Sequence, residues 1–134
     1  MDRLFLDANV LFSAAYRTDG GLVRLWKLTN VVLCSSRYAL GEARANLLDE
    51  AQHRRLAQLA DGLQFFEAPE GLLPRGIALP EKDAPILLAA VAARAHYLLT
   101  GDLRHFGAYF GKRIEGVTIV SPAQYFRIRQ REER

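Results

Sequence analysis

The chain has 134 residues, of which 50% are hydrophobic and 25% are charged, and its formal net charge is +3. This length and composition predict one compact domain over residues 1–134 and exclude a disordered protein, while the basic balance permits a phosphate-bearing partner. A single cysteine, Cys34, excludes an internal disulfide, and no apolar run is long enough to span a membrane. We therefore expect a soluble, cytoplasmic protein.

In the first half of the chain, short apolar runs alternate with longer helical patterns. Gly20 and Gly21 interrupt the earliest helical pattern, and Ser36 suits the N-cap of a later helix. Gly62 ends the last helical pattern of this half. The predicted elements are, in order, a strand at residues 4–6, helices at 9–16 and 22–28, a strand at 31–34, and helices at 36–50 and 51–60.

The second half continues this alternation around a loop at residues 69–80, which contains three prolines and two glycines. The strongest helical pattern begins at Asp83 and carries Pro85 in its first turn, where proline is tolerated. The predicted elements are strands at 64–66, 97–100 and 117–120, a helix at 83–95, and a last helix from 121 with a solvated tail at 127–134. Strands that alternate with helices predict an α/β fold with a parallel sheet of about five strands, covered on both faces.

Four carboxylates belong to one edge of this predicted sheet. Asp7 and Asp102 each follow a strand directly, and the carboxyl ends of parallel strands meet at one edge. Asp83 begins the helix that leads into the strand before Asp102, and Glu42 lies early in the helix after the second strand, so both can reach this edge. Each acid alone can be explained as a cap or a solvated helix residue. Their convergence favours a functional site.

The expected chemistry of this cluster follows from its charge. Ionised carboxylates at close range are costly without a cation, and oxygen ligands suit Mg²⁺ or Mn²⁺. Two such ions can activate a water and stabilise the leaving oxygen in phosphodiester cleavage. Asn9, two residues after Asp7, can hold a water or orient that carboxylate.

Two residues near Asp102 are ambiguous in the sequence. Arg104 is a candidate contact to a phosphate, and an exposed surface arginine explains it equally well. His105 precedes Phe106, which indicates a packed turn, so we interpret this histidine as structural rather than as a general acid.

Four segments of the chain match known motifs, and the most specific is the helix from Asp83 followed by Leu-Leu-Thr-Gly-Asp. The matching segments are LFLDANVL at 4–11, LGEA at 40–43, DAPILLAA at 83–90 and LLTGD at 98–102. Through them the chain resembles the PIN-domain family, and most closely the small single-domain PIN proteins that are toxins of toxin–antitoxin pairs. The resemblance extends from Asp7 to the strand near Val120.

This resemblance implies a three-layer α/β/α sandwich around a central parallel sheet. It also implies a metal-dependent endoribonuclease, a hydrolase that uses Mg²⁺ or Mn²⁺ to cleave RNA. The implied partners are RNA, a cognate antitoxin protein and a second copy of the chain in a homodimer, with no membrane. The implied catalytic and metal-binding residues are Asp7, Glu42, Asp83 and Asp102, with Asn9 and Thr100 as accessory polar residues near the metals.

Other functions place an aspartate after a first strand, and they fit less well. A haloacid-dehalogenase-like enzyme requires Asp-x-Asp, whereas this chain has Asp7-Ala8-Asn9. A receiver domain requires a lysine after the last strand, whereas Ser121-Pro122 follow Val120. The chain has no glycine-rich phosphate-binding loop, so its sequence gives no sign of a nucleotide cofactor. A non-catalytic RNA- or protein-binding module on the same fold stays open.

Overall fold

The computed structural model describes residues 1–132. Their strands are β1 (Asp2–Leu6), β2 (Val31–Ser35), β3 (Gln64–Phe65), β4 (Tyr97–Leu99), β5 (Arg113–Ile114) and β6 (Val117–Val120). They form one sheet in the order β3-β2-β1-β4-β6-β5, in which only β5 runs antiparallel to its neighbour. The parallel strands predicted from the sequence are thus confirmed, and β5 is an addition at the edge.

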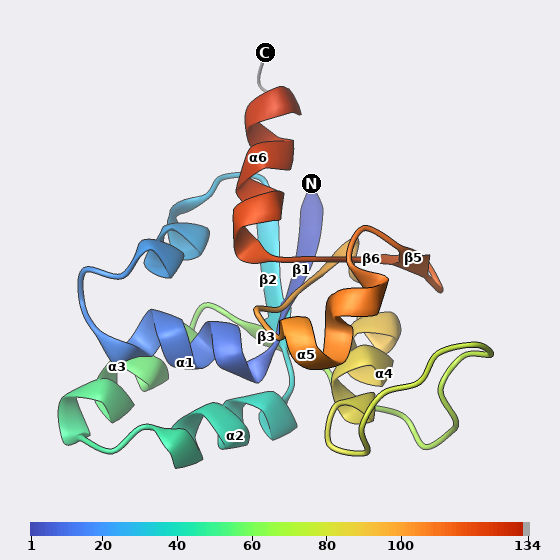
Figure 1. Cartoon of the computed structure of the whole chain (residues 1–134). Helices are drawn as coiled ribbons and strands as arrows, with labels where there is room; N and C mark the ends of the chain where they lie inside the picture. Colours follow the sequence, from blue (N-terminus) through green and yellow to red (C-terminus); the bar gives the residue numbers. More distant parts are fainter. Residues whose placement is uncertain (133–134) are drawn as a thin grey trace.

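Helices cover the sheet and occupy distinct regions around it. They are α1 (Ala8–Tyr16), α2 (Arg37–Asn46), α3 (Glu50–Ala60), α4 (Ala84–Ala92), α5 (Leu103–Phe106) and α6 (Pro122–Glu132), with 3₁₀ turns η1 (Gly21–Lys27) and η2 (Gly107–Tyr109). Figure 1 shows α1, α2 and α3 grouped on one side of β1 and β2, and α4 on the other. This arrangement confirms the predicted α/β/α fold. None of these helices within residues 1–132 combines the length and apolar character that crossing a bilayer requires.

The central strands are apolar over most of their length because helices exclude water from both faces of the sheet. Leu4, Phe5 and Leu6 of β1 are fully buried, as are Leu98 and Leu99 of β4. A polar residue follows each of these strands, Asp7 after β1 and Thr100 after β4, and both are buried at the sheet edge. The core therefore fixes where the polar residues after β1 and β4 emerge.

The helix predicted at residues 36–50 ends earlier than expected. Ser36 caps α2 by accepting from the backbone N–H of Ala39, as predicted, but Leu47 already follows the last residue of this helix. Asp49 then caps α3 in a reciprocal capping box with Gln52. The sequence analysis predicted a break between two helices but placed it at residues 50–51, whereas the Asp-x-x-Gln cap starts α3 at Glu50 after a gap at Leu47–Asp49.

Other boundaries differ for local reasons. The segment predicted as a helix at 22–28 is the 3₁₀ turn η1, and the helix predicted at 83–95 ends at Ala92. The strand β5 pairs with β6 through a two-residue turn at Glu115 and Gly116, which both have positive φ. A two-residue strand carries too little pattern to be recognised.

The last helix, α6, packs back onto the start of the chain. Tyr125 is fully buried and its hydroxyl donates to Oδ2 of Asp2 at 2.7 Å. Figure 1 shows α6 beside the N-terminus, away from the edge where β1 and β4 end. Of the tail predicted at 127–134, residues 133–134 lie outside the described residues.

Candidate active site

A cleft of about 630 Å³ opens at the edge of the sheet where β1 and β4 end. Its lining comes from Asp7 with the following helix α1, from α2, from the segment before α4 and from the segment after β4. The polar and charged lining residues that matter here are Asp7, Asn9, Glu42, Lys82, Asp83 and Asp102. The structure therefore brings the four carboxylates of the sequence analysis to one cleft.

Asp7 and Thr100 meet because β1 and β4 are parallel neighbours in register. Leu6 lies opposite Leu99, so the next residue of each strand emerges at the same point of the edge. The Thr100 hydroxyl donates to Oδ2 of Asp7 at 2.7 Å, and Thr100 is fully buried. These contacts hold the Asp7 carboxylate at the floor of the cleft.

Asn9 links the ends of both strands. Its side-chain N–H donates to Oδ2 of Asp7 at 3.0 Å and to the Thr100 hydroxyl oxygen at 3.2 Å. Its carbonyl oxygen accepts from the backbone N–H of Gly101 at 2.8 Å. From the sequence we expected Asn9 either to orient Asp7 or to hold a water. Its hydrogen bond to Oδ2 of Asp7 is the contact that orienting the carboxylate requires.

Burial raises the pKa of Asp7 to about 6. The hydrogen bonds from Thr100 and from the backbone N–H of Ala8 oppose this shift, whereas the charges of Asp83 and Asp102 add to it. Only 4% of Asp7 is exposed, so water screens its charge poorly. The hydrogen bonds to Asp7 therefore do not fully offset the cost of burying its negative charge.

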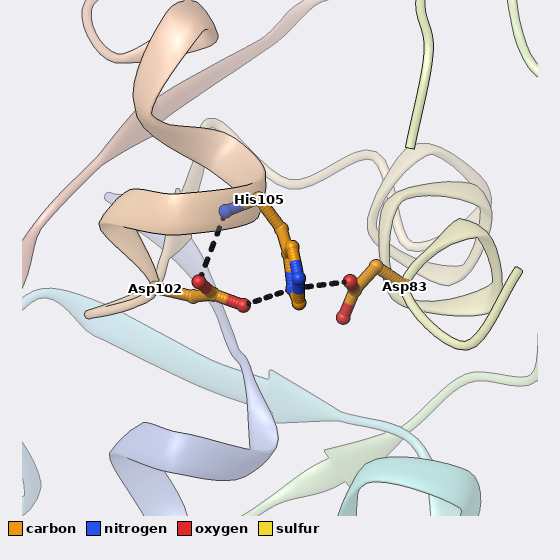
Figure 2. A group of neighbouring side chains, drawn as sticks. All are labelled: Asp83, Asp102 and His105. Atoms are coloured by element: carbon orange, nitrogen blue, oxygen red, sulfur yellow. Dashed lines mark hydrogen bonds and ion pairs between the residues drawn. The ribbon is translucent and has the colours of Figure 1, made fainter. Parts of the chain in front are cut away.

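Asp102 serves two purposes at once in the structure. One oxygen, Oδ1, caps the short helix α5 by accepting from the backbone N–H of His105 at 3.0 Å. The other, Oδ2, faces the His105 ring nitrogen Nδ1 at 2.8 Å (Figure 2). The capping interpretation and the cleft interpretation of Asp102 are therefore both correct.

Asp83 precedes α4 but does not cap it. Its side chain accepts no hydrogen bond from the helix, and Pro85 in the first turn has no N–H to offer. Its Oδ2 lies 2.9 Å from Nδ1 of His105, opposite Asp102 (Figure 2). Burial is the main cause that raises the Asp83 pKa, against the lowering effect of His105.

The buried oxygen Oδ2 of Asp83 has no hydrogen bond among the described residues, despite its short distance to His105. A ring nitrogen carries at most one hydrogen, so Nδ1 of His105, which lies within 3 Å of both aspartates, cannot donate a full hydrogen bond to each of them. Ligand atoms of Asp83, Asp102 and His105 all lie within 4.8 Å of one another. This donor set fits a divalent cation, which would supply the partner that Asp83 lacks.

Glu42 reaches the cleft from α2, where it is half-buried. Tyr38, one helical turn earlier, donates from its hydroxyl to the backbone oxygen of Lys82 at 2.7 Å. This contact ties α2 to the segment before α4 and so keeps Glu42 on the same side of the cleft as Asp83. The Tyr38 contact joins positions 44 residues apart and has no signal in the sequence.

The cationic side chain that lines the cleft is Lys82 rather than Arg104, which was the expected candidate. Arg104 is exposed on α5, and it is not among the described residues that line the cleft. Lys82 does line the cleft, next to Asp83, and the sequence analysis did not select it. His105 was interpreted as structural. It lies three residues after Asp102, however, and an N-cap aspartate bonds to the backbone of the third residue after it, which brings the two side chains together.

Comparison with known protein families gives one match. Residues 3–104 match the family model described as "PIN domain". The matched region runs from β1 into α5 and contains all four carboxylates of the cleft. The search of curated proteins returns no match for this chain.

Proposed function

This chain belongs to the PIN-domain family, which has a nuclease-type fold, and from that premise we propose that it is a metal-dependent endoribonuclease that hydrolyses RNA phosphodiester bonds. The observation that carries the proposal is the convergence of Asp7, Glu42, Asp83 and Asp102 on one cleft. A nuclease needs such a concentration of negative charge to hold cations against a phosphate.

Asp83 and Asp102 are the residues best placed to hold a cation, with Asp7 and Glu42 completing the oxygen donors. Oxygen donors of this kind suit Mg²⁺ or Mn²⁺. When bound, such an ion supplies positive charge that acidifies the attacking water and stabilises the developing charge on the phosphate. Asp83 supports this assignment because its buried Oδ2 lacks a hydrogen-bond donor.

The protein's own residues prepare the cleft for this reaction. Thr100 and Asn9 fix the Asp7 carboxylate through hydrogen bonds to its Oδ2, so no reorganisation is needed when substrate binds. Lys82 gives the acidic cleft an exposed ammonium that can attract a backbone phosphate. The proposed hydrolysis requires no covalent enzyme intermediate.

The experiment that tests this function is cleavage of a mixed RNA pool with Mg²⁺ or Mn²⁺. The wild type should cleave, and Asp7→Asn should be slower by at least about 100-fold, since it removes a charge from the site. Asp61→Asn is the matched control, because Asp61 is an exposed acid beyond α3, outside the cleft. Equal rates for wild type and Asp7→Asn would overturn the proposal, and RNA binding without cleavage would favour the non-catalytic binding module.

We further propose that the nuclease is the toxin of a toxin–antitoxin pair and acts as a homodimer. The support for this role is the resemblance of its motifs to single-domain PIN toxins. Expression of the chain in a bacterial host should arrest growth, and co-expression of an adjacent small gene should relieve the arrest. Normal growth with active nuclease present would contradict the toxin role and leave the nuclease activity in place.

A further inference from the structure

His105 lies between two carboxylates of the cleft, Asp83 and Asp102, and among residues 1–132 it is the only histidine grouped with them. We infer that Nδ1 of His105 is a direct ligand of the catalytic cation, so that the site is a mixed oxygen–nitrogen centre that prefers Mn²⁺ to Mg²⁺. This inference rests on the proposed function and adds a ligand that the acidic set does not contain.

The backbone around His105 holds the ring in place. Asp102 caps α5 through the backbone N–H of His105, and the neighbouring Phe106 is fully buried. The His105 side chain is 22% exposed, as is that of Asp102, so it is largely shielded from water without being buried. Its position is therefore fixed by the cap on one side and by the core on the other.

The direction of Nδ1 matches that of a ligand. A ring nitrogen has one bonding direction in the ring plane, used by either a hydrogen or a metal. In His105 this nitrogen lies 2.8 Å from Oδ2 of Asp102 and 2.9 Å from Oδ2 of Asp83 (Figure 2). A cation held by both oxygens would therefore lie where the imidazole can also bind it.

Asp83 gives independent support for a cation at this point. Asp83 is only 7% exposed, and its buried Oδ2 has no hydrogen bond among residues 1–132. This oxygen lies on the His105 side of the carboxylate. A single hydrogen on Nδ1 cannot satisfy both aspartates, whereas a cation that accepts several ligands can.

The nitrogen ligand decides which cation is preferred. Mg²⁺ takes oxygen ligands and keeps several waters, whereas imidazole nitrogen adds affinity for first-row transition metals. A site of two carboxylates and one imidazole should therefore bind Mn²⁺ more tightly than Mg²⁺. Asp7 and Glu42, the other carboxylates of the cleft, offer oxygen ligands alone and do not produce this preference.

Pulsed electron paramagnetic resonance of bound Mn²⁺ tests the ligand directly, because it detects nitrogen bonded to the metal. The wild-type protein should show a directly bound ¹⁴N, and labelling its histidines with ¹⁵N should change that signal as the isotope requires. His105→Ala should remove the signal. His96→Gln is the matched control, since Nδ1 of His96 accepts from the backbone N–H of Arg3, far from the cleft.

Affinities give a second readout that is independent of cleavage. His105→Ala should weaken Mn²⁺ binding by about tenfold or more and Mg²⁺ binding by less than about threefold. Mn²⁺ bound without a nitrogen signal would overturn the inference and leave the nuclease proposal standing. Failure of the wild type to bind either Mn²⁺ or Mg²⁺ would overturn both. The ¹⁵N experiment uses only wild-type protein, so it decides the matter even if His105→Ala does not fold.

Discussion

The hydroxyl of Thr100 donates a 2.7 Å hydrogen bond to Oδ2 of Asp7, and 93 residues of chain separate the two. The same hydroxyl oxygen accepts from the backbone N–H of Asp102 at 3.1 Å. Thr100 therefore connects two of the cleft carboxylates, one after each central strand. Its side chain is fully buried, so no water can replace these contacts.

Replacement of Thr100 by valine should destabilise the protein. Thr100→Val keeps the shape of the side chain but removes a donor from the buried Asp7 and an acceptor from Asp102. We expect a loss of about 1–3 kcal/mol in the free energy of unfolding, measured by urea titration of metal-free protein at neutral pH. Thr100→Ser retains the hydroxyl and should lose much less. Equal losses in the two variants would contradict the stabilising role given to these hydrogen bonds.

Replacement of Asn9 by aspartate tests the orienting amide. Asn9→Asp removes the N–H that Asp7 accepts and adds a negative charge beside it, while keeping the oxygen that accepts from Gly101. We expect the metal-free variant to lose more stability than the wild type between pH 5 and pH 8, because a second ionised carboxylate then lies beside Asp7. Thermal unfolding at the two pH values measures this. A variant whose pH profile matches the wild type would contradict the role given to the amide.

Much of the fold and the outline of the site follow from sequence alone, because they depend on strand order and strand ends. The apolar runs before Asp7 and Asp102 are visible in the sequence, and a parallel sheet places their ends at one edge. The break before α3 was predicted, but it was placed a few residues late because the surrounding helical pattern is continuous and only the Asp49 cap marks the boundary. The strand β5 was missed because it contains two residues.

The parts of the site that could not be predicted are contacts between distant side chains. Tyr38 positions α2 by bonding to the backbone of Lys82, and no local pattern signals that pair. Lys82 itself is one of many exposed charges until the cleft is seen. For His105, the burial of Phe106 was predicted correctly, but a packed turn and a cleft position are compatible, and the sequence does not distinguish them.

The stability of the metal-free protein should fall as pH rises from about 4 to about 6. The pKa of Asp7 is raised from 3.8 to about 6, so the folded state binds its proton more tightly than the unfolded state does over this range. A shift of this size corresponds to a loss of about 3 kcal/mol once Asp7 is ionised in both states. Urea unfolding between pH 4 and pH 7 measures the slope.

Asp7→Asn provides the comparison for this pH dependence, because asparagine does not titrate. Its stability should change less between pH 4 and pH 7 than that of the wild type. Identical slopes for the two proteins would show that Asp7 titrates normally in the fold. The comparison concerns the slopes alone, since asparagine also loses one acceptor at the start of α1.

Mn²⁺ should stabilise the wild type and fail to stabilise Asp83→Asn. At about 100 times its dissociation constant, a bound ion adds about 2.7 kcal/mol to the free energy of unfolding, and EDTA should reverse the gain. Burial raises the pKa of Asp83, so its ionised form is penalised in the folded state, and the neutral asparagine should not destabilise the metal-free protein at neutral pH. Thermal unfolding with Mn²⁺ and with EDTA measures both effects. An Asp83→Asn protein that gained as much stability from Mn²⁺ as the wild type would place the cation elsewhere.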